Sequence, residues 1–344
     1  MFLTEANVLR YLADRQFGDF ETAVSGEFAV RSLTRRNRNL HVTCGPREYL
    51  VKQANRWDFG GRTSVEREAA FYRQRETRKQ LANLVPQCYA YDPPNSVLVL
   101  EFLPRHTDLY DAPDRFAPET GRLCGEAMGA FHREMESGSL ASEFPGAVPW
   151  VLSFHEVAED LVEPSAGQRE LAREVKKYAE FGRALDRLRA EWRADTLTHG
   201  DWKLENCLVS PDRDRLRVVD WEFVSWGDSV WDVSALLQSY CNLWVHWPME
   251  FPIEAIQPAL RAFLDAYARS RGWELAEFTA RAIRFTGARM LQAAFESLDE
   301  AEEMTGPAVR LMQGSLHVFT RPDWAAEQLI GTPLRRMSAA CILN

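Results

Sequence analysis

Four polar residues near the middle of the chain have the types and the spacing that phosphoryl-group chemistry requires. His199, Asp201 and Asn206 follow the pattern His-x-Asp-x-x-x-x-Asn, and Asp220 ends the next apolar run. An aspartate can orient or accept the proton of an attacking hydroxyl, while amide and carboxylate oxygens bind the Mg²⁺ ions that neutralise phosphates. We therefore take Asp201 as the candidate base, and Asn206 and Asp220 as the candidate Mg²⁺ ligands.

The segments around these residues predict strands that bring them together. Residues 207–209 and 216–219 are short apolar runs on either side of a turn at 210–213. This arrangement is typical of a β-hairpin. We expect the hairpin to place Asn206 and Asp220 at strand ends, near Asp201.

Taken together, the motifs resemble those of the aminoglycoside phosphotransferase and choline kinase family, whose fold is protein-kinase-like. The loop His199-Gly-Asp201 has the form found in that family, whereas protein kinases carry an arginine after the histidine. Asp220-Trp-Glu222 stands in place of Asp-Phe-Gly, and residues 226–233 also resemble the family. The motifs span about residues 20–235, and the helical tail fits more loosely. The resemblance implies a kinase that uses ATP and Mg²⁺.

The order of the predicted elements suits such a fold. The patterns predict strands at 27–32, 39–44 and 49–53, a helix from 63 to about 84, and strands at 87–91 and 96–102. Beyond these, apolar residues recur at helical spacing. We therefore predict an α+β, two-lobed protein-kinase-like fold. A small β-rich N-lobe with one main helix covers 1–103, and a large helical C-lobe covers 104–344.

Three charged residues of the predicted small lobe are candidate nucleotide-binding residues. Lys52 ends an apolar strand, and an inward-pointing lysine needs an anionic partner because a buried unpaired cation is costly. The resemblance supplies two partners, the α/β-phosphates and a helix glutamate. Glu66 and Glu68 compete for the second role, and we prefer Glu68 for its sequence context. Glu101 lies at the predicted boundary between the two lobes. This boundary would be the hinge that contacts the nucleotide base.

The expected phosphate-binding loop contains no glycine. Residues 32–39 read Ser-Leu-Thr-Arg-Arg-Asn-Arg-Asn, where protein kinases have three glycines. Without glycine the backbone cannot approach phosphates as closely. Side chains can substitute, either Thr34 and Asn37 or the arginines at 35, 36 and 38, although a solvated basic turn explains each arginine equally well.

The resemblance also assigns supporting roles around the candidate base. His199 would hold the loop through hydrogen bonds, and Asp232 would bind the loop backbone. Lys203 stands where serine/threonine kinases carry a lysine that contacts the γ-phosphate, which adds peptide hydroxyls to the possible acceptors.

Two segments are candidates for binding the acceptor. One contains Trp244 and Trp247 with Asn242 and His246, where family members build the acceptor pocket, although most such tryptophans are core residues. The other is the acidic run at 296–303, which is either a solvated face or a docking patch for a cationic acceptor.

Composition narrows the choice of function. Residues 1–110 hold 16 basic and 13 acidic residues, and the remainder holds 25 basic and 37 acidic ones. The acidic remainder argues against a nucleic-acid substrate. No apolar run approaches the length of a membrane span, and the first residues do not form a signal peptide. The six cysteines lack metal-binding spacing, so we expect free thiols, no membrane partner and a cytoplasmic protein.

The sequence therefore predicts an ATP- and Mg²⁺-dependent phosphotransferase that acts on a hydroxyl of a small molecule or of a peptide Ser or Thr. The alternative is a pseudokinase that binds nucleotides or partners without transferring phosphate. The absence of glycine at 32–39 favours the alternative, and the presence of Lys52, Asp201, Asn206 and Asp220 opposes it.

Overall fold

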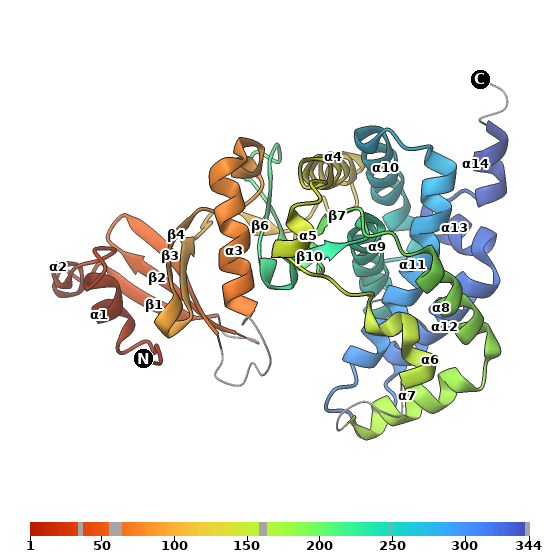
Figure 1. The fold of residues 1–344 in the computed structure, drawn as a ribbon, viewed down its shortest axis with the longest axis horizontal. Helices are drawn as coiled ribbons and strands as arrows, with labels where there is room; N and C mark the ends of the chain where they lie inside the picture. Colours follow the sequence, from red (N-terminus) through yellow and green to blue (C-terminus); the bar gives the residue numbers. More distant parts are fainter. Residues whose placement is uncertain (34–36, 55–63, 158–163, 248, 341–344) are drawn as a thin grey trace. The chain divides into compact units, whose positions relative to one another are not determined.

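The computed structural model describes residues 1–33, 37–54, 64–157, 164–247 and 249–340, drawn in colour in Figure 1. The chain forms two compact units. The first comprises Met1–Thr107 and Cys207–Val224, and the second comprises Asp108–Asn206 and Ser225–Asn344. The two lobes expected at 1–103 and 104–344 stay a prediction. Residues 207–224, although they come late in the sequence, belong to the same unit as the N-terminal residues.

A five-stranded antiparallel sheet lies at the centre of the first unit, among the residues described there. Its strands agree with the predicted ones to within two residues. Their order is β1 (Phe28–Ser32), β2 (Arg38–Cys44), β3 (Arg47–Gln53), β5 (Val97–Glu101) and β4 (Cys88–Asp92).

Alternation along the strands gives the sheet two different faces. On one face, Val42 and Val51 pack with Val8 and Leu12 of helix α1 (Val8–Ala13), and all four are fully or almost fully buried. Lys52, the residue after Val51, faces the opposite side of the sheet, because successive side chains of a strand alternate. Helix α3 (Ser64–Thr77) lies on that second side, and α2 (Phe20–Val24) precedes β1 (Figure 1).

Helix α3 is shorter than the sequence pattern predicts. It ends at Thr77 rather than near residue 84, because Arg78 has an extended backbone with φ −116° and ψ 95°. Short 3₁₀ turns follow at Lys79–Asn83 and, after β4, at Pro93–Asn95. The carbonyl of Leu84 accepts a hydrogen bond from Val218 N at 2.7 Å, which joins this segment to the predicted hairpin.

The hairpin consists of β8 (Cys207–Val209) and β9 (Leu216–Val218), paired antiparallel as the sequence indicates. A 3₁₀ turn at Trp221–Phe223 follows Asp220. Strand β6 (Thr107–Asp108) lies where the chain passes from the first unit to the second.

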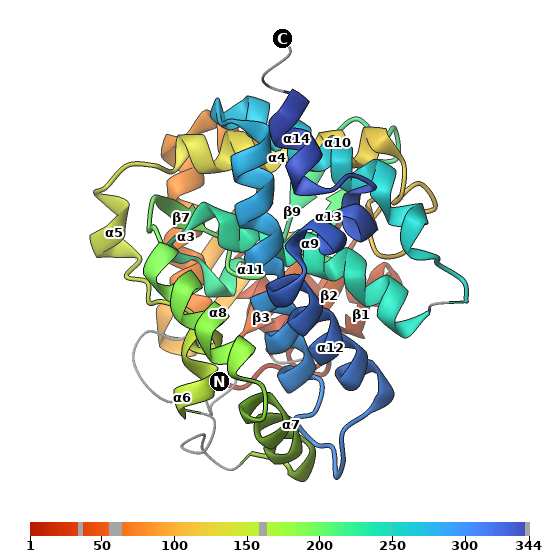
Figure 2. The same cartoon turned by 90° about the vertical axis from the view of Figure 1, so that its right-hand side faces the viewer.

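The second unit is mainly helical (Figure 2). Its α-helices are α4 (Pro118–Glu134), α5 (Leu140–Glu143), α6 (Phe154–Val157), α7 (Ala166–Lys176), α8 (Ala179–Glu191), α9 (Ser229–His246), α10 (Ile253–Arg271), α11 (Leu275–Glu296), α12 (Gly306–Thr320), α13 (Pro322–Ile330) and α14 (Leu334–Ala340). Trp150–Ser153 form a 3₁₀ turn before α6. Helix α11 packs against α9 and α12. The short strands β7 (Thr196–Thr198) and β10 (Ser225–Gly227) pair antiparallel.

Helices α4 and α10 approach closely because α4 presents glycines at every fourth position. A Cβ on Gly121 would lie 2.0 Å from Ala259 O, and one on Gly125 would lie 2.3 Å from Phe263 O. Residues four apart share one face of a helix, so these glycines form a groove for the backbone of α10.

Within the described ranges, no helix combines the length and the apolar character that crossing a membrane requires. The cysteines at 44, 88, 124, 207 and 241 are free thiols.

Candidate functional site

Lys52 lies at the centre of a buried charge cluster in the first unit. Its Nζ is 2.8 Å from Glu68 Oε2 and 3.6 Å from Glu222 Oε2, and it also donates to Asp220 Oδ1. Burial alone would lower the pKa of Lys52, but the three carboxylates outweigh it and raise the pKa above its usual value. The lysine is therefore a protonated cation with anionic partners, as its inward position requires.

Of the two glutamates considered from the sequence, Glu68 is the one whose contact with Lys52 the structure gives. Its side chain is completely buried in α3, and its Oε1 accepts hydrogen bonds from Trp221 N at 3.3 Å and Tyr72 Oη at 3.4 Å. Burial raises the pKa of Glu68, while the charge of Lys52 opposes the shift. The rings of Phe71 and Trp221 stack with their centroids 4.1 Å apart, which fixes α3 against the turn after Asp220.

Asp220 is the most accessible member of the cluster. Its side chain is 39% exposed, against 4% for Lys52 and 0% for Glu68. The residue has a left-handed backbone with φ 67° and ψ 57°, a conformation that aspartate tolerates better than most residues. The left-handed turn ends strand β9 and leaves an exposed carboxylate, the type of ligand that Mg²⁺ prefers.

Glu222 belongs to the sequence motif Asp220-Trp-Glu222, and the structure adds it to the residues of the charge cluster. It is 4% exposed and accepts a hydrogen bond from Asn37 Nδ2, which also donates to Ser64 Oγ at 3.3 Å. Asn37 therefore contacts the carboxylate cluster. The acidic character of Glu222, two positions after Asp220, was the only sequence signal that it could join the site. The sequence around it does not indicate that it pairs with Asn37.

The other candidates from the phosphate loop are only partly described. Thr34 and the arginines at 35 and 36 lie outside the described residues. The guanidinium carbon of Arg38 lies 4.2 Å from the centroid of the Phe2 ring, so this arginine stacks on an aromatic side chain.

Glu101 ends β5, and its side chain is paired within the first unit. Its Oε2 accepts hydrogen bonds from Arg217 Nη2 at 2.6 Å and from Gln87 N at 2.9 Å. The carboxylate therefore joins strand β9 to the sheet.

The second unit carries the residues of the candidate catalytic loop, in the segment that follows β7. Asp201 is 27% exposed, and its Oδ2 lies 2.7 Å from Lys203 Nζ. Asn206 Nδ2 donates to Asp201 O at 2.9 Å and to Asp201 Oδ2 at 3.3 Å. Since the amide nitrogen of Asn206 is turned toward Asp201, its amide oxygen is the atom left for a cation. The structure thus brings together Asp201, Lys203 and Asn206.

Behind this loop lies a network of buried polar groups. Asp232 Oδ2 accepts hydrogen bonds from His199 N at 2.7 Å and from His132 Nε2 at 3.1 Å, and its Oδ1 accepts one from Gly200 N at 2.9 Å. Burial would raise the pKa of Asp232, but the hydrogen bond from His132 and the charges of His132 and His199 outweigh it and lower the pKa. His199 also accepts a hydrogen bond from Asp201 N at 3.2 Å through its Nδ1.

The residues considered for acceptor binding lie on α9 and just after it, and from the end of α11 onward. Trp247 is 48% exposed just after α9, whereas Trp231 and Trp221 are core residues. The pKa of Glu296 is raised by desolvation, and among the charges that act on it are Arg289 and Asp201. One member of the acidic run therefore lies in the electrostatic field of the catalytic loop.

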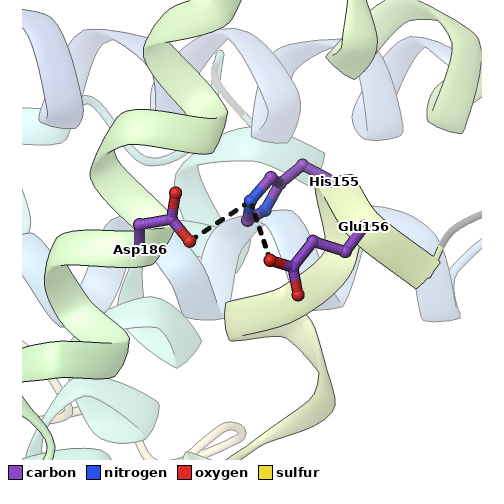
Figure 3. Close-up of side chains that lie close together, drawn as sticks. All are labelled: His155, Glu156 and Asp186. Carbon is purple, nitrogen blue, oxygen red and sulfur yellow. Dashed lines mark ion pairs between the residues drawn. The ribbon is translucent and has the colours of Figure 1, made fainter.

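A separate cluster of possible metal ligands lies on α6 and α8, where His155 points toward Glu156 and Asp186 (Figure 3). His155 Nε2 is 3.3 Å from Asp186 Oδ1 and 3.9 Å from Glu156 Oε1. Arg189 already donates to both oxygens of Glu156, at 2.7 and 3.1 Å, and to Asp186 Oδ1 at 2.9 Å. Since a permanent cation occupies these carboxylates, we interpret the cluster as an ion-pair network between two helices.

The comparison with protein families gives one match that covers most of the chain. The model of the phosphotransferase enzyme family matches residues 29–273. This range includes every described residue of the charge cluster and of the catalytic loop. No curated protein sequence matches the chain significantly.

Solved structures with a similar fold include several kinases of small molecules. Choline kinase from Cryptosporidium parvum aligns with 14% identity and a TM-score of 0.62, covering 96% of this chain and 99% of that one. Ethanolamine kinase from Plasmodium vivax aligns with 12% identity and a TM-score of 0.58, covering 94% and 92%. Spectinomycin phosphotransferase, solved with ADP and spectinomycin, aligns with 11% identity and a TM-score of 0.50, covering 88% and 93%. At these identities the similarity concerns the fold, and it confirms the predicted protein-kinase-like α+β class.

Proposed function

The chain belongs to the phosphotransferase enzyme family, and from this premise we propose that it transfers the γ-phosphate of ATP to a hydroxyl of a small molecule. The observation that carries this proposal is the pairing of Lys52 with Glu68 and Asp220. A buried, protonated lysine that a helix glutamate holds in place is a preformed site for the α/β-phosphates. Asp220, at its side, offers an exposed carboxylate.

The donor set fits Mg²⁺, because it consists of oxygen atoms. By the sequence motif, Asp220 and the amide oxygen of Asn206 are the two ligands that would hold the ion, which would neutralise the charge that develops on the phosphates. Asp220 also pairs with Lys52, so binding of the ion would compete with that contact. Glu222 accepts a hydrogen bond from Asn37 and lies near Lys52, so its carboxylate adds negative charge around the lysine.

In the proposed reaction, Asp201 orients the acceptor hydroxyl and receives its proton. The hydroxyl oxygen forms a bond to the γ-phosphorus while the bond to the β,γ-bridging oxygen breaks, which leaves ADP. Lys203, paired with Asp201 at 2.7 Å, brings a positive charge to the phosphoryl group during transfer. Asn206 and His199 keep the aspartate in place through the hydrogen bonds described above.

The acceptor is most consistent with a small hydroxyl compound that carries positive charge. Supporting features are the excess of acidic residues beyond residue 110 and the exposed Trp247, which can stack on a cation. The similar structures include kinases named for choline and ethanolamine. A peptide Ser or Thr is the second candidate acceptor, and Lys203 is the residue that favours it.

Mg²⁺-dependent release of ADP tests the proposal directly. Choline, ethanolamine, spectinomycin, hygromycin B and a Ser-rich peptide would be offered in turn, with the Asp201→Asn variant as the control. Acceptor-dependent release that the variant lacks would support the transferase and identify the class of acceptor. Tight ATP binding without any acceptor-dependent release would favour the pseudokinase, to which the glycine-free loop points.

A further inference from the structure

Arg289 is a buried arginine of α11 that contacts the catalytic loop without belonging to any sequence motif. The residue is 6% exposed, and its Nη2 donates to Gly200 O at 2.7 Å. Its guanidinium carbon lies 3.8 Å from the centroid of the Trp231 ring, and its Nε is 3.4 Å from Trp231 O. These contacts hold the guanidinium group in one orientation.

The carbonyl that Arg289 binds belongs to the peptide bond that leads into Asp201. The amide hydrogen of this same peptide, on Asp201, is donated to His199 Nδ1 at 3.2 Å. Because a peptide unit is planar, holding both its carbonyl and its amide fixes where the Cα of Asp201 lies. Arg289 and His199 therefore hold opposite sides of the peptide that positions the catalytic carboxylate.

The backbone at Gly200 explains why such a donor is needed. Gly200 has φ 83°, a conformation that L-residues rarely adopt, and its amide is already bound by Asp232 Oδ1 at 2.9 Å. The Gly200 carbonyl meets Arg289 of α11. A backbone carbonyl that packs against a buried side chain needs a donor, and Arg289 is that donor.

The guanidinium keeps its charge in this position. Burial lowers the pKa of Arg289 to about 10, against the attraction of Asp201, Asp232 and Glu296. The arginine is therefore protonated at neutral pH, and hydrogen bonds from charged donors are stronger than neutral ones.

We propose that Arg289 is a positioning residue for the transfer reaction: it fixes the direction of Asp201 by holding the Gly200 carbonyl. The inference rests on the proposed phosphotransferase function, since it gives Asp201 its task. Arg289 acts through the backbone of the loop, so it governs the turnover step. ATP affinity depends on other residues, chiefly Lys52.

The test compares Arg289→Lys and Arg289→Ala with changes at Arg281, a matched arginine two turns earlier on α11. Arg281 donates to Asp228 Oδ1 and to the carbonyl of Glu191, both at 3.0 Å, whereas Arg289 donates to the loop at Gly200. We expect Arg289→Ala to lower kcat about 100-fold, the scale of a misplaced catalytic group, and to leave the ATP dissociation constant within about threefold. Lysine keeps the charge but lacks the planar fork, so Arg289→Lys should recover only part of kcat.

Two further measurements distinguish positioning from a general loss of stability. Guanidinium ion, at a concentration too low to denature the protein, should restore turnover to Arg289→Ala, whereas sodium chloride at equal ionic strength should not. Amide hydrogen exchange of residues 199–206 should speed up in Arg289→Ala. In Arg281→Ala the exchange of this loop should stay unchanged relative to the rest of the chain.

The inference and the proposed function can fail separately. If the wild-type protein transfers phosphate but Arg289→Ala keeps its kcat and its slow loop exchange, Arg289 does not position Asp201. If the wild-type protein transfers no phosphate, the proposed function is wrong. The loop exchange then decides alone whether Arg289 fixes the backbone before Asp201.

Discussion

Lys52 Nζ on β3 lies 2.8 Å from Glu68 Oε2 on α3, and both side chains are almost completely buried. Asp220 and Glu222 also contact this lysine, so one cation faces three carboxylates. The cluster therefore carries excess negative charge when its carboxylates are ionised. A divalent cation beside Asp220 would relieve that excess, which links metal binding to the stability of the first unit.

The charge count predicts an order of stabilities for two variants. Lys52→Met removes the cation and leaves buried carboxylates to repel one another, which should cost about 3–5 kcal/mol. Glu68→Gln leaves Lys52 with Asp220 and Glu222, and should cost about 1–3 kcal/mol. Urea unfolding of both variants would measure the difference. If Glu68→Gln were the more destabilising change, Lys52 would not be the residue that neutralises the cluster.

Replacement of the candidate base should separate binding from turnover. Asp201→Asn keeps the shape of the side chain but loses the negative charge, so kcat should fall by about 10² to 10⁴ while ATP still binds. Asp212→Asn, in the exposed turn of the hairpin, is the matched control and should leave kcat unchanged. Turnover of Asp201→Asn within a few-fold of wild type would remove this aspartate from the proposed role.

The assignment of Asp220 as a metal ligand can be tested without disturbing the backbone. Asparagine also tolerates the left-handed conformation at this position, so Asp220→Asn removes the charge and keeps the turn. In the wild type, Mg-ATP at about 100 times its dissociation constant should stabilise the fold by about 2.7 kcal/mol. Thermal-shift titrations with and without EDTA should show that the Mg²⁺-dependent part is lost in the variant. An equal shift in both proteins would contradict the assignment.

The glycine stripe of α4 predicts a stability effect far from the chemistry. A Cβ on Gly125 would meet Phe263 O at 2.3 Å, so Gly125→Ala must push α10 away and should cost about 1–3 kcal/mol. At Gly138 a Cβ would meet nothing within 4 Å, and Gly138→Ala should change stability by less than about 0.5 kcal/mol. Chemical denaturation would compare the two. Equal stability of both variants would show that α10 adjusts without cost.

The parts of the site that lie in one motif or one strand could be predicted from the sequence. The pattern from His199 to Asn206 is local, and the apolar neighbours of Lys52 showed that it points inward. The length of α3 could not be predicted, because it ends at the extended backbone of Arg78, and the chain beyond it is held by a hydrogen bond from the distant Val218 to Leu84. The role of Arg289 could not be predicted from the sequence either. It occupies an ordinary position in a helix, and only the folded loop shows what it binds.

The course of the chain between the two units has a consequence for biosynthesis. Cys207–Val224 belongs to the first unit although a long stretch of the second precedes it. When residues 1–107 have been synthesised, the residues of the sheet strands and of α3 are present, but the stacking partner of Phe71 and two of the carboxylates around Lys52 are not. The first unit can therefore be completed only after residue 224 has been translated, and until then the nascent chain carries an incomplete charge cluster.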